Sequence, residues 1–372
     1  MRSLNDEIQQ LLQSLVDSGQ EIGLQVAAYV DGQLVVDTWA GLADPDTGRR
    51  VDGETLFSSW STTKGFAATC AHILAERGVI EYDAPIARYW PEFAAHGKGA
   101  ATVRHALTHA AGVPQMPAQA TPELICDWEA MCAAIADLEP LWAPGTKVGY
   151  HAWTFGWIIG EIVRRADGRS LARVAQDELC RPLGIDGFFL GIPDEAEPRV
   201  APLREEPPAP RTPLGQRALP PSLTNAATIN RPDVRRASIP GAGGIMNARA
   251  IARHYAMLAR GGELDGARVL SAQQIALASA LQTDQRDEVD ETRTRRALGY
   301  MLGGLEAEGG KPAMGNSITA FGHPGHGGSL GFADPQRRLG FGLTKNLLKA
   351  GVKWNQTAAF QVTEAIRSRI DS

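Results

Sequence analysis

The chain has 372 residues, of which 44% are hydrophobic and 21% charged. These values are typical of a globular protein whose core is large enough for two subdomains. A formal net charge of −5 and a pI near 5.9 exclude a strong electrostatic attraction to nucleic acid or anionic membranes, and the short basic runs at 235–236 and 293–296 are interpreted as solvated faces.

The first eighty residues carry a helical pattern, a hairpin pattern and a second helical pattern. Leucine and isoleucine recur at helical spacing near the amino terminus. Asp31-Gly32 lies between two β-rich runs, which is a strong hairpin signal. The predicted elements are a helix over 4–18, strands over 24–30 and 34–39, an extended piece over 55–59, and a helix that begins at Ser61 and ends at Gly78.

Short helical patterns and a proline-rich segment fill the middle of the chain. Residues 193–240 contain 11 prolines, and so long a loop inside a compact domain is usually functional or disordered. Because proline stiffens the backbone, this segment is predicted either to lie over a binding site or to be a disordered excursion. The predicted helices are 103–109, 124–138, 152–165 and 171–179, and then 248–260 with Asn247 as its N-cap.

Strand patterns return at the end of the chain, and a helix closes it. Strands that follow directly on one another favour an antiparallel sheet. The order of elements predicts an α/β (α+β) fold in which residues 1–60 and 241–372 form a sandwich domain, and residues 61–240 form a largely helical inserted subdomain that ends in the 193–240 loop. The predicted strands are 297–305, 318–321, 329–333 and 339–345, and the closing helix is 356–370.

Ser61-Thr-Thr-Lys64 is the first stretch that carries chemistry. Residues three apart on a helix share a face, so the Ser61 hydroxyl and the Lys64 amine can meet. A serine becomes a nucleophile when a base takes its proton, and a buried lysine is suited to that task because desolvation lowers its pKa. The Ser61 N–H, at a helix N-terminus, suits a developing oxyanion. The alternative is an N-capping serine followed by a solvated lysine.

Tyr150 follows the Pro144-Gly145 turn and precedes a predicted helix. A tyrosine beside the Lys64 cation is expected to have a lowered pKa, because a nearby positive charge favours phenolate. Tyr150 is then a candidate to take the Ser61 proton and return it to a leaving group. The alternative is a packed tyrosine with a hydrogen-bonded hydroxyl.

Phe321-Gly-His323-Pro-Gly325-His-Gly-Gly-Ser329 is dense in glycine, which lets a backbone approach a ligand closely. Its N–H groups are candidates for an oxyanion hole, and His323 is a candidate to hydrogen-bond Tyr150 or the substrate. A metal site at His323 and His326 needs a third ligand that the neighbouring sequence does not supply. We therefore expect neither a metal nor a cofactor.

The cysteines and the amino terminus indicate a cellular location. No two of the four cysteines have C-x-x-C spacing, so neither a redox motif nor a zinc knuckle is predicted. No apolar signal-peptide region opens the sequence, and no run of 18 apolar residues occurs in it. These observations predict a cytoplasmic protein with reduced thiols.

The three motifs together resemble those of serine hydrolases of the class C β-lactamase and penicillin-binding-protein superfamily, and most closely those of the family VIII carboxylesterases. Ser61-x-x-Lys64 matches the first motif, Tyr150-His-Ala152 the Tyr-x-Asn position, and His323-Pro-Gly325 the Lys-Thr-Gly position. The resemblance covers about residues 20–365. It implies a β-lactamase/transpeptidase-like fold, with an antiparallel sheet flanked by the N- and C-terminal helices and a helical insertion.

The resemblance also implies roles for individual residues. Ser61 is acylated, Lys64 and Tyr150 share the proton transfers, and water releases the acid. The implied oxyanion donors are the N–H groups of Ser61 and His326, and His323 is the remaining catalytic candidate. The residues expected to contact the substrate are Trp60, His151, Gly325 and Gly327.

Three positions depart from the lactamase pattern. Ala152 replaces an asparagine, His323 a lysine and Pro324 a threonine. These changes weaken recognition of carboxylate-bearing amides, whereas an ester needs less help because an alkoxide leaves more easily than an amine. The sequence therefore predicts a serine carboxylesterase. Its expected partner is a small-molecule ester, with no nucleic acid and no membrane, and the oligomeric state stays open. The alternatives are an acyltransferase, a β-lactamase or D-amino-acid amidase, and a catalytically inactive penicillin-binding-like protein.

Overall fold

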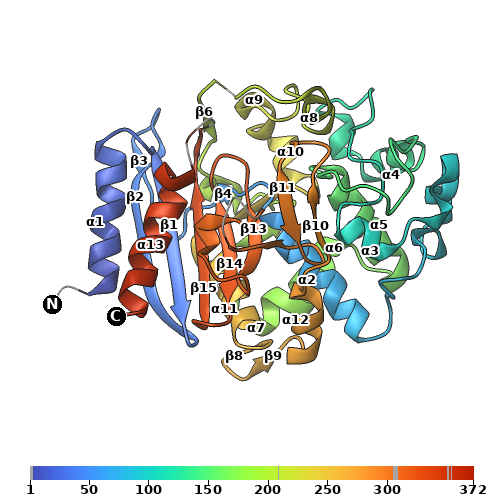
Figure 1. Ribbon diagram of the computed structural model, residues 1–372. Coiled ribbons are helices and arrows are strands. Elements are labelled where there is room, and N and C mark those ends of the chain that lie inside the picture. Colours follow the sequence, from blue (N-terminus) through green and yellow to red (C-terminus); the bar gives the residue numbers. More distant parts are fainter. Residues whose placement is uncertain (1–2, 208, 305–308, 350–351, 353) are drawn as a thin grey trace.

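The computed structural model describes residues 3–207, 209–304, 309–349, 352 and 354–372. Figure 1 shows a sheet between helices on the side of the molecule that holds both chain ends, and a helical region on the other side. The strands of the main sheet are β1 (Gly23–Val30), β2 (Gln33–Asp44), β3 (Arg49–Arg50), β10 (Thr283–Arg286), β11 (Arg293–Arg296), β12 (Met301–Leu302), β13 (Phe321–Pro324), β14 (Leu330–Asp334) and β15 (Leu339–Lys345).

The main sheet is antiparallel throughout, as predicted. Within the described residues its order is β10-β11-β12-β13-β14-β15-β1-β2-β3, and each neighbouring pair runs in opposite directions. Leu24 pairs with Lys345 and Val30 with Leu339, so the first and last long strands are neighbours. The two ends of the chain thus build one sheet.

The β1–β2 hairpin forms where Asp31-Gly32 predicts it. Both residues have positive φ, +47° and +83°, as a type I′ turn requires. β2 continues beyond the predicted end at Trp39, because residues as far as Asp44 pair with β3. The hairpin therefore extends beyond the residues that the sequence pattern predicts as strand.

Two of the strand predictions near the end of the chain are wrong in extent. In the range 297–305 only Met301–Leu302 is strand, because Ala297 N–H donates to Tyr300 O at 2.9 Å and closes a turn; residue 305 lies outside the described residues. Of the range 318–321, only Phe321 belongs to β13. The strand predicted over 339–345 is confirmed at both ends.

Helices cover both faces of the main sheet. α1 (Leu4–Asp17) and α13 (Ala358–Ile370) lie side by side on one face (Figure 1), and α11 (Ala248–Ala259) packs on the other. Side chains of β1 alternate accordingly, since Val26 packs toward α1 and α13 whereas Ala27 packs toward α11. Asn247 caps α11 as predicted, accepting from Ala250 N–H at 2.8 Å.

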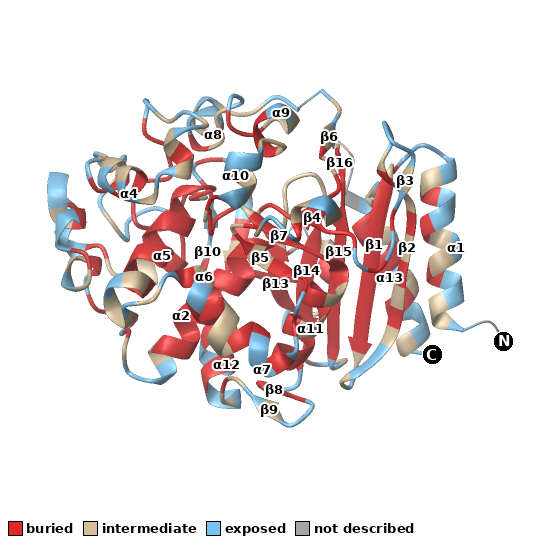
Figure 2. Ribbon diagram, turned by 180° about the vertical axis from the view of Figure 1, so that it is seen from behind, coloured by how far each residue is buried: buried red, intermediate tan, exposed pale blue. Residues whose placement is uncertain are grey.

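The helical region holds the largely buried helices α2 and α5, which are mostly red in Figure 2. The range predicted as one helix, 124–138, is broken at Asp127, whose side chain caps the second part. The helices here are α2 (Thr63–Glu76), α3 (Val103–Leu107), α4 (Trp128–Ala136), α5 (Thr154–Asp167), α6 (Leu171–Val174), a π-helical turn over Ala175–Cys180, α7 (Arg181–Leu183) and α12 (Ala272–Ser279), with 3-10 turns at Ile86–Arg88, Pro91–Ala100 and Leu124–Cys126.

The proline-rich segment, residues 193–240, contains regular structure, so its interpretation as a loop is wrong. It holds β6 (Arg204–Glu205), α8 (Pro213–Ala218), α9 (Ala226–Ile229) and α10 (Pro232–Arg236); residue 208 lies outside the described residues. Two of the prolines begin α8 and α10, where a missing N–H breaks no hydrogen bond. β6 pairs in parallel with β16 (Leu347–Leu348), just after β15. The segment runs along the upper edge of Figure 1.

A small antiparallel sheet leads into the Ser61 region. It consists of β4 (Phe57–Ser58), β7 (Gly244–Met246) and β5 (Phe188–Leu190), with β7 in the middle. A separate hairpin, β8 (Glu263–Leu264) and β9 (Ala267–Arg268), follows α11. Among the helices of the described residues, none combines the length and apolarity needed to cross a bilayer.

Candidate active site

Ser61 lies in the turn between β4 and α2, just before the helix begins at Thr63. Its neighbour Trp60 has a φ of +49°, a left-handed conformation that costs free energy in a residue other than glycine. The turn is held on both sides, because Ser59 N–H donates to Gly244 O at 2.9 Å and Lys64 N–H donates to Ser61 O at 3.0 Å. β7 and the start of α2 therefore fix the backbone that presents Ser61.

Lys64 is fully buried, with its Nζ 3.0 Å from Ser61 Oγ. Nζ also donates to Ala152 O and to Gly241 O, both at 2.6 Å. Burial holds the pKa of Lys64 well below its usual value. A neutral amine has two N–H groups and one lone pair; when the two carbonyls take the N–H groups, the lone pair is left for the Ser61 hydroxyl. This is the arrangement of a base beside a nucleophile.

Tyr150 lies just before α5, against the same two residues. Its hydroxyl hydrogen-bonds Ser61, and Lys64 Nζ is 5.0 Å from the ring centroid. Burial raises the pKa of Tyr150 far above its usual value, and this effect outweighs the Ser61 hydrogen bond and the positive charge of Arg296. The expected lowering of this pKa by the Lys64 cation is therefore wrong. Tyr150 is a neutral phenol.

A buried ion pair, Asp287–Arg296, supports Tyr150. Arg296 Nη2 donates to Asp287 Oδ2 at 2.5 Å, and the exposed fractions of the two side chains are 1% and 0%. Asp287 Oδ1 accepts from the N–H groups of Tyr150 and Val289, at 3.2 and 2.8 Å. Although burial alone raises the pKa of Asp287, Arg296 and these hydrogen bonds bring it below its usual value.

This pair was not predicted from the sequence, and the interpretation of 293–296 as a solvated face is wrong for Arg296. One signal was present: side chains alternate between the faces of a strand, so Thr294 and Arg296 share the face opposite Arg293. In β11 that shared face is the buried one.

His323 lies on β13 with its ring against Tyr150, the centroids 6.0 Å apart and the planes at 25°. The structure brings the two rings together without a hydrogen bond between them; Nδ1 donates to Pro324 O at 2.7 Å. Nε2 is buried and has no partner within the described residues. Burial holds the pKa of His323 well below its usual value, so the ring is neutral.

The loop after β13 is clamped onto the Ser61 turn. Ser329 Oγ donates to Ser59 O at 2.9 Å and lies 3.3 Å from Thr62 Oγ1. Gly325 has no room for a side chain, because a Cβ there would lie 2.4 Å from Ser59 O. The His326 ring meets the Trp60 ring edge-on, with centroids 5.2 Å apart.

This clamp places the two predicted oxyanion donors in one region. In the part of the chain that the structure describes, neither the Ser61 N–H nor the His326 N–H donates a hydrogen bond. Both remain available to a ligand.

The residues expected to contact substrate divide into two groups. Trp60, Gly325 and Gly327 lie on or beside the clamped loop and the Ser61 turn. His151 does not fit its prediction, because its side chain is fully buried, its Nδ1 pairs with Gly149 O at 2.6 Å, and its Nε2 accepts from Val113 N–H at 3.2 Å. His151 therefore holds backbone together.

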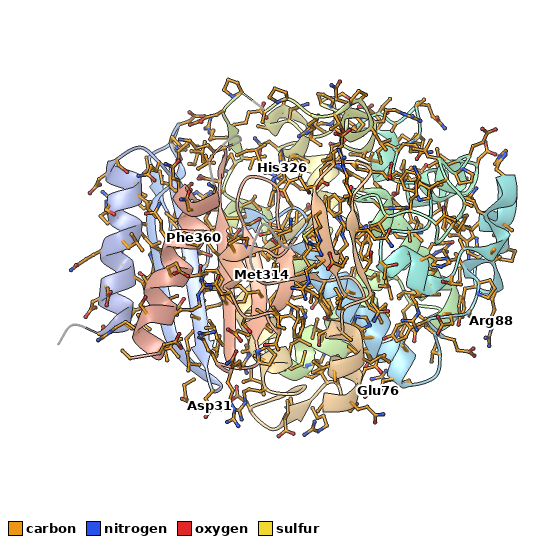
Figure 3. The ribbon with its side chains drawn as sticks, viewed as in Figure 1. Asp31, Glu76, Arg88, Met314, His326 and Phe360 are labelled. Carbon is orange, nitrogen blue, oxygen red and sulfur yellow. The ribbon has the colours of Figure 1, made fainter. Side chains whose placement is uncertain are left out.

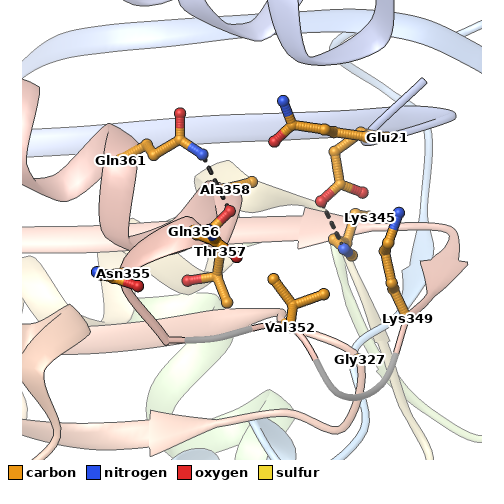
Figure 4. Close-up of a pocket in the computed structure, with 12 residues that line it drawn as sticks. Glu21, Gly327, Lys345, Lys349, Val352, Asn355, Gln356, Thr357, Ala358 and Gln361 are labelled. Carbon is orange, nitrogen blue, oxygen red and sulfur yellow. Dashed lines mark hydrogen bonds and ion pairs between the residues drawn. The ribbon is translucent and has the colours of Figure 1, made fainter. Parts of the chain in front are cut away.

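A polar cavity of about 900 Å³ borders the same loop (Figure 4). Gly327 and Gly328 belong to its wall, as do Glu21 and Lys345, which form an ion pair of 2.6 Å. Burial raises the pKa of Glu21 in spite of Lys345. Ser61 is not among the residues that line this cavity. No cluster of three His, Cys, Asp or Glu side chains suited to a metal ion occurs among the described residues.

Comparisons with known proteins agree with this architecture. Over residues 8–362 the sequence matches the Beta-lactamase family. LipL of Mycobacterium tuberculosis, described as an esterase/beta-lactamase, is 35% identical over 353 residues, which are 91% of this chain and 80% of LipL. A crystal structure of a family VIII carboxylesterase superposes with a TM-score of 0.88 and 34% identity, covering 99% of this chain and 98% of that one. A penicillin-binding protein homologue from Caulobacter crescentus matches with the same TM-score and coverage at 33% identity.

The fold and these similarities define a serine hydrolase with the β-lactamase/transpeptidase-like architecture. The chain belongs to the Beta-lactamase family, and the resemblance to family VIII carboxylesterases that its three motifs indicate is confirmed.

Proposed function

We propose that the protein is a carboxylesterase that hydrolyses small carboxylic esters through a covalent acyl-enzyme on Ser61. The observation that carries the proposal is the contact between Ser61 Oγ and the uncharged amine of Lys64, 3.0 Å away. An uncharged lysine whose two N–H groups are already held by carbonyls accepts a proton from the serine hydroxyl without rearranging.

The net result of the proposed acylation is that the Ser61 proton passes to the alcohol, while a bond from Ser61 Oγ to the acyl carbon replaces the ester bond. Lys64 takes the hydroxyl proton as Ser61 Oγ attacks the ester carbonyl, and the N–H groups of Ser61 and His326 stabilise the oxyanion. When the intermediate collapses, the bond to the alcohol oxygen breaks, and the phenol of Tyr150 protonates the leaving alkoxide. The Lys64 ammonium returns a proton to Tyr150. Water then attacks the acyl-enzyme with the same groups acting in reverse, and the acid is released.

Three features of the site favour an ester over an amide or a lactam. The side chain of Ala152 is a methyl group and offers no amide to the substrate. Pro324 has no hydroxyl and no N–H, and the His323 ring is neutral. A β-lactam carboxylate therefore meets no positive charge at position 323.

The second candidate activity is β-lactam hydrolysis, which the name of LipL mentions beside esterase activity. An acyltransferase differs only in the acceptor, an alcohol in place of water. A catalytically inactive binding protein is the remaining alternative, and a fluorophosphonate probe separates it from the enzymes because the probe labels an activated serine.

The test combines substrates with labelling. p-Nitrophenyl esters of graded chain length are assayed beside nitrocefin and a D-alanyl anilide, with wild type and Ser61→Ala. We expect ester turnover, one adduct on Ser61 by intact-mass spectrometry, and loss of both in Ser61→Ala. Full activity of Ser61→Ala would refute the proposal.

A further inference from the structure

The proline-rich segment places an arginine at the edge of the proposed active site. Arg211 Nη2 lies 3.2 Å from His326 Nε2. His326, labelled in Figure 3, lies below the part of this segment that carries α8 and α9. Its ring packs on Trp60, the residue before Ser61. Arg211 is thus one side chain away from the loop that carries the proposed oxyanion donor.

Hydrogen bonds hold the guanidinium of Arg211 in place, but not all of its N–H groups have an acceptor. Its Nη1 donates to Leu219 O at 2.8 Å and to Thr224 Oγ1 at 3.2 Å. Of the five N–H donors of an arginine, Nε–H and one N–H of Nη2 are left without an acceptor among the described residues. No carboxylate of those residues forms an ion pair with Arg211, although most arginines on this surface have one.

Arg211 shares a small cavity with two carboxylates that have other partners. A small cavity of about 130 Å³ is lined by Arg211 and His326 together with Glu205 and Glu206. Glu206 pairs with Lys349 at 3.2 Å, and Glu205 Oε2 accepts from Ala226 N–H at 2.9 Å. Lys349 therefore balances the charge of Glu206, whereas Glu205 has a hydrogen bond but keeps its charge. Burial and Arg211 lower the pKa of His326 to about 4, so its ring is neutral and its Nε2 accepts from Arg211.

We propose that Arg211 binds a carboxylate of the substrate, so that the preferred esters carry an acid group a few atoms from the scissile bond. This inference rests on the proposed function of Ser61. An arginine with two free N–H groups binds a carboxylate through charge-assisted hydrogen bonds. The positive charge missing at position 323 is thereby supplied from a different element.

Two matched pairs of esters test the inference and locate the acid group. On the acyl side, 4-nitrophenyl hydrogen glutarate is compared with 4-nitrophenyl valerate, which has a methyl group in place of the carboxylate. On the alcohol side, 4-acetoxybenzoate is compared with 4-methylphenyl acetate. Each kcat/KM is measured for wild type, Arg211→Met, Arg211→Lys and the control Arg217→Met, which removes an exposed arginine of the same segment.

In one of the two arms, Arg211→Met should lower kcat/KM for the acid ester about ten- to a hundredfold and that for its neutral partner less than about threefold. Arg211→Lys should recover part of the loss, and Arg217→Met should change neither ester. Ratios of acid to neutral ester that Arg211→Met leaves unchanged in both arms would overturn the inference. A wild-type preference for 4-nitrophenyl 5-aminovalerate over 4-nitrophenyl hydrogen glutarate would also overturn the inference, because the glutamates of the cavity would then bind the ammonium group of that ester. Absence of ester turnover together with absence of Ser61 labelling in wild type would refute the proposed function itself.

Discussion

Removal of the Asp287 carboxylate should be among the most damaging single changes near the site. Asp287→Ala leaves the Arg296 charge in a position that is 1% exposed, and leaves the N–H groups of Tyr150 and Val289 without their acceptor. Breaking a buried pair from one side costs about 3–5 kcal/mol, because an uncompensated charge stays behind. Since Tyr150 also loses a backbone anchor, kcat should fall at least about tenfold.

The assay is urea unfolding combined with ester turnover. The double variant Asp287→Ala/Arg296→Met removes the stranded charge and should recover most of the stability, to within about 1–2 kcal/mol of wild type. Glu81→Ala, at the exposed Arg88–Glu81 pair, is the control and should change stability by less than about 0.5 kcal/mol. If Asp287→Ala lowers the free energy of unfolding by less than about 1 kcal/mol, or if the double variant is less stable than the single one, the ion pair does not stabilise the site.

Three further predictions concern the proposed catalytic groups. Lys64→Ala and Tyr150→Phe should each lower kcat at least about a hundredfold and the double variant little more, because residues that act as a unit lose activity non-additively; additive losses in single-turnover assays would contradict this. Because burial lowers the pKa of Lys64 and the base must be uncharged, kcat/KM should fall as the pH drops through that pKa and stay level above it; a profile that rises toward acid pH would place the base elsewhere. Because the His323 ring is neutral, a β-lactam carboxylate loses one charged contact, worth about 1.5–3 kcal/mol or roughly ten- to a hundredfold in kcat/KM, and the missing amide at Ala152 adds to this loss. Short p-nitrophenyl esters should therefore exceed nitrocefin by at least about three orders of magnitude in kcat/KM, and His323→Lys should narrow that ratio; a wild-type ratio near one would favour the lactamase.

Features set by neighbours in the sequence could be predicted. Asp31-Gly32 produces a turn because both residues tolerate positive φ, and the hairpin follows. Ser61 and Lys64 meet because residues three apart share one side of the tight turn that leads into α2. The strand 339–345 was predicted at both ends because its pattern is β-rich.

Features set by tertiary contacts could not be predicted in the same way. Asp287 and Arg296 lie on opposite sides of a turn, and only the folded sheet shows that Arg296 faces the interior. In residues 193–240 the prolines were read as breakers of regular structure, yet those at 213 and 232 begin helices. Histidine is a common residue in active sites, but both ring nitrogens of His151 are hydrogen-bonded to the backbone in the interior, which the sequence does not reveal.

The pKa of Tyr150 was predicted in the wrong direction for a reason that bears on the mechanism. The prediction treated Lys64 as a fixed cation, and a cation beside a phenol lowers its pKa. Burial acts on both groups at once, lowering the pKa of the lysine and raising that of the tyrosine, so it favours the uncharged form of each. An uncharged amine is able to accept a proton and an uncharged phenol is able to donate one. The same burial thus suits Lys64 to the proposed role of base toward Ser61 and Tyr150 to the proposed role of acid toward the leaving alkoxide.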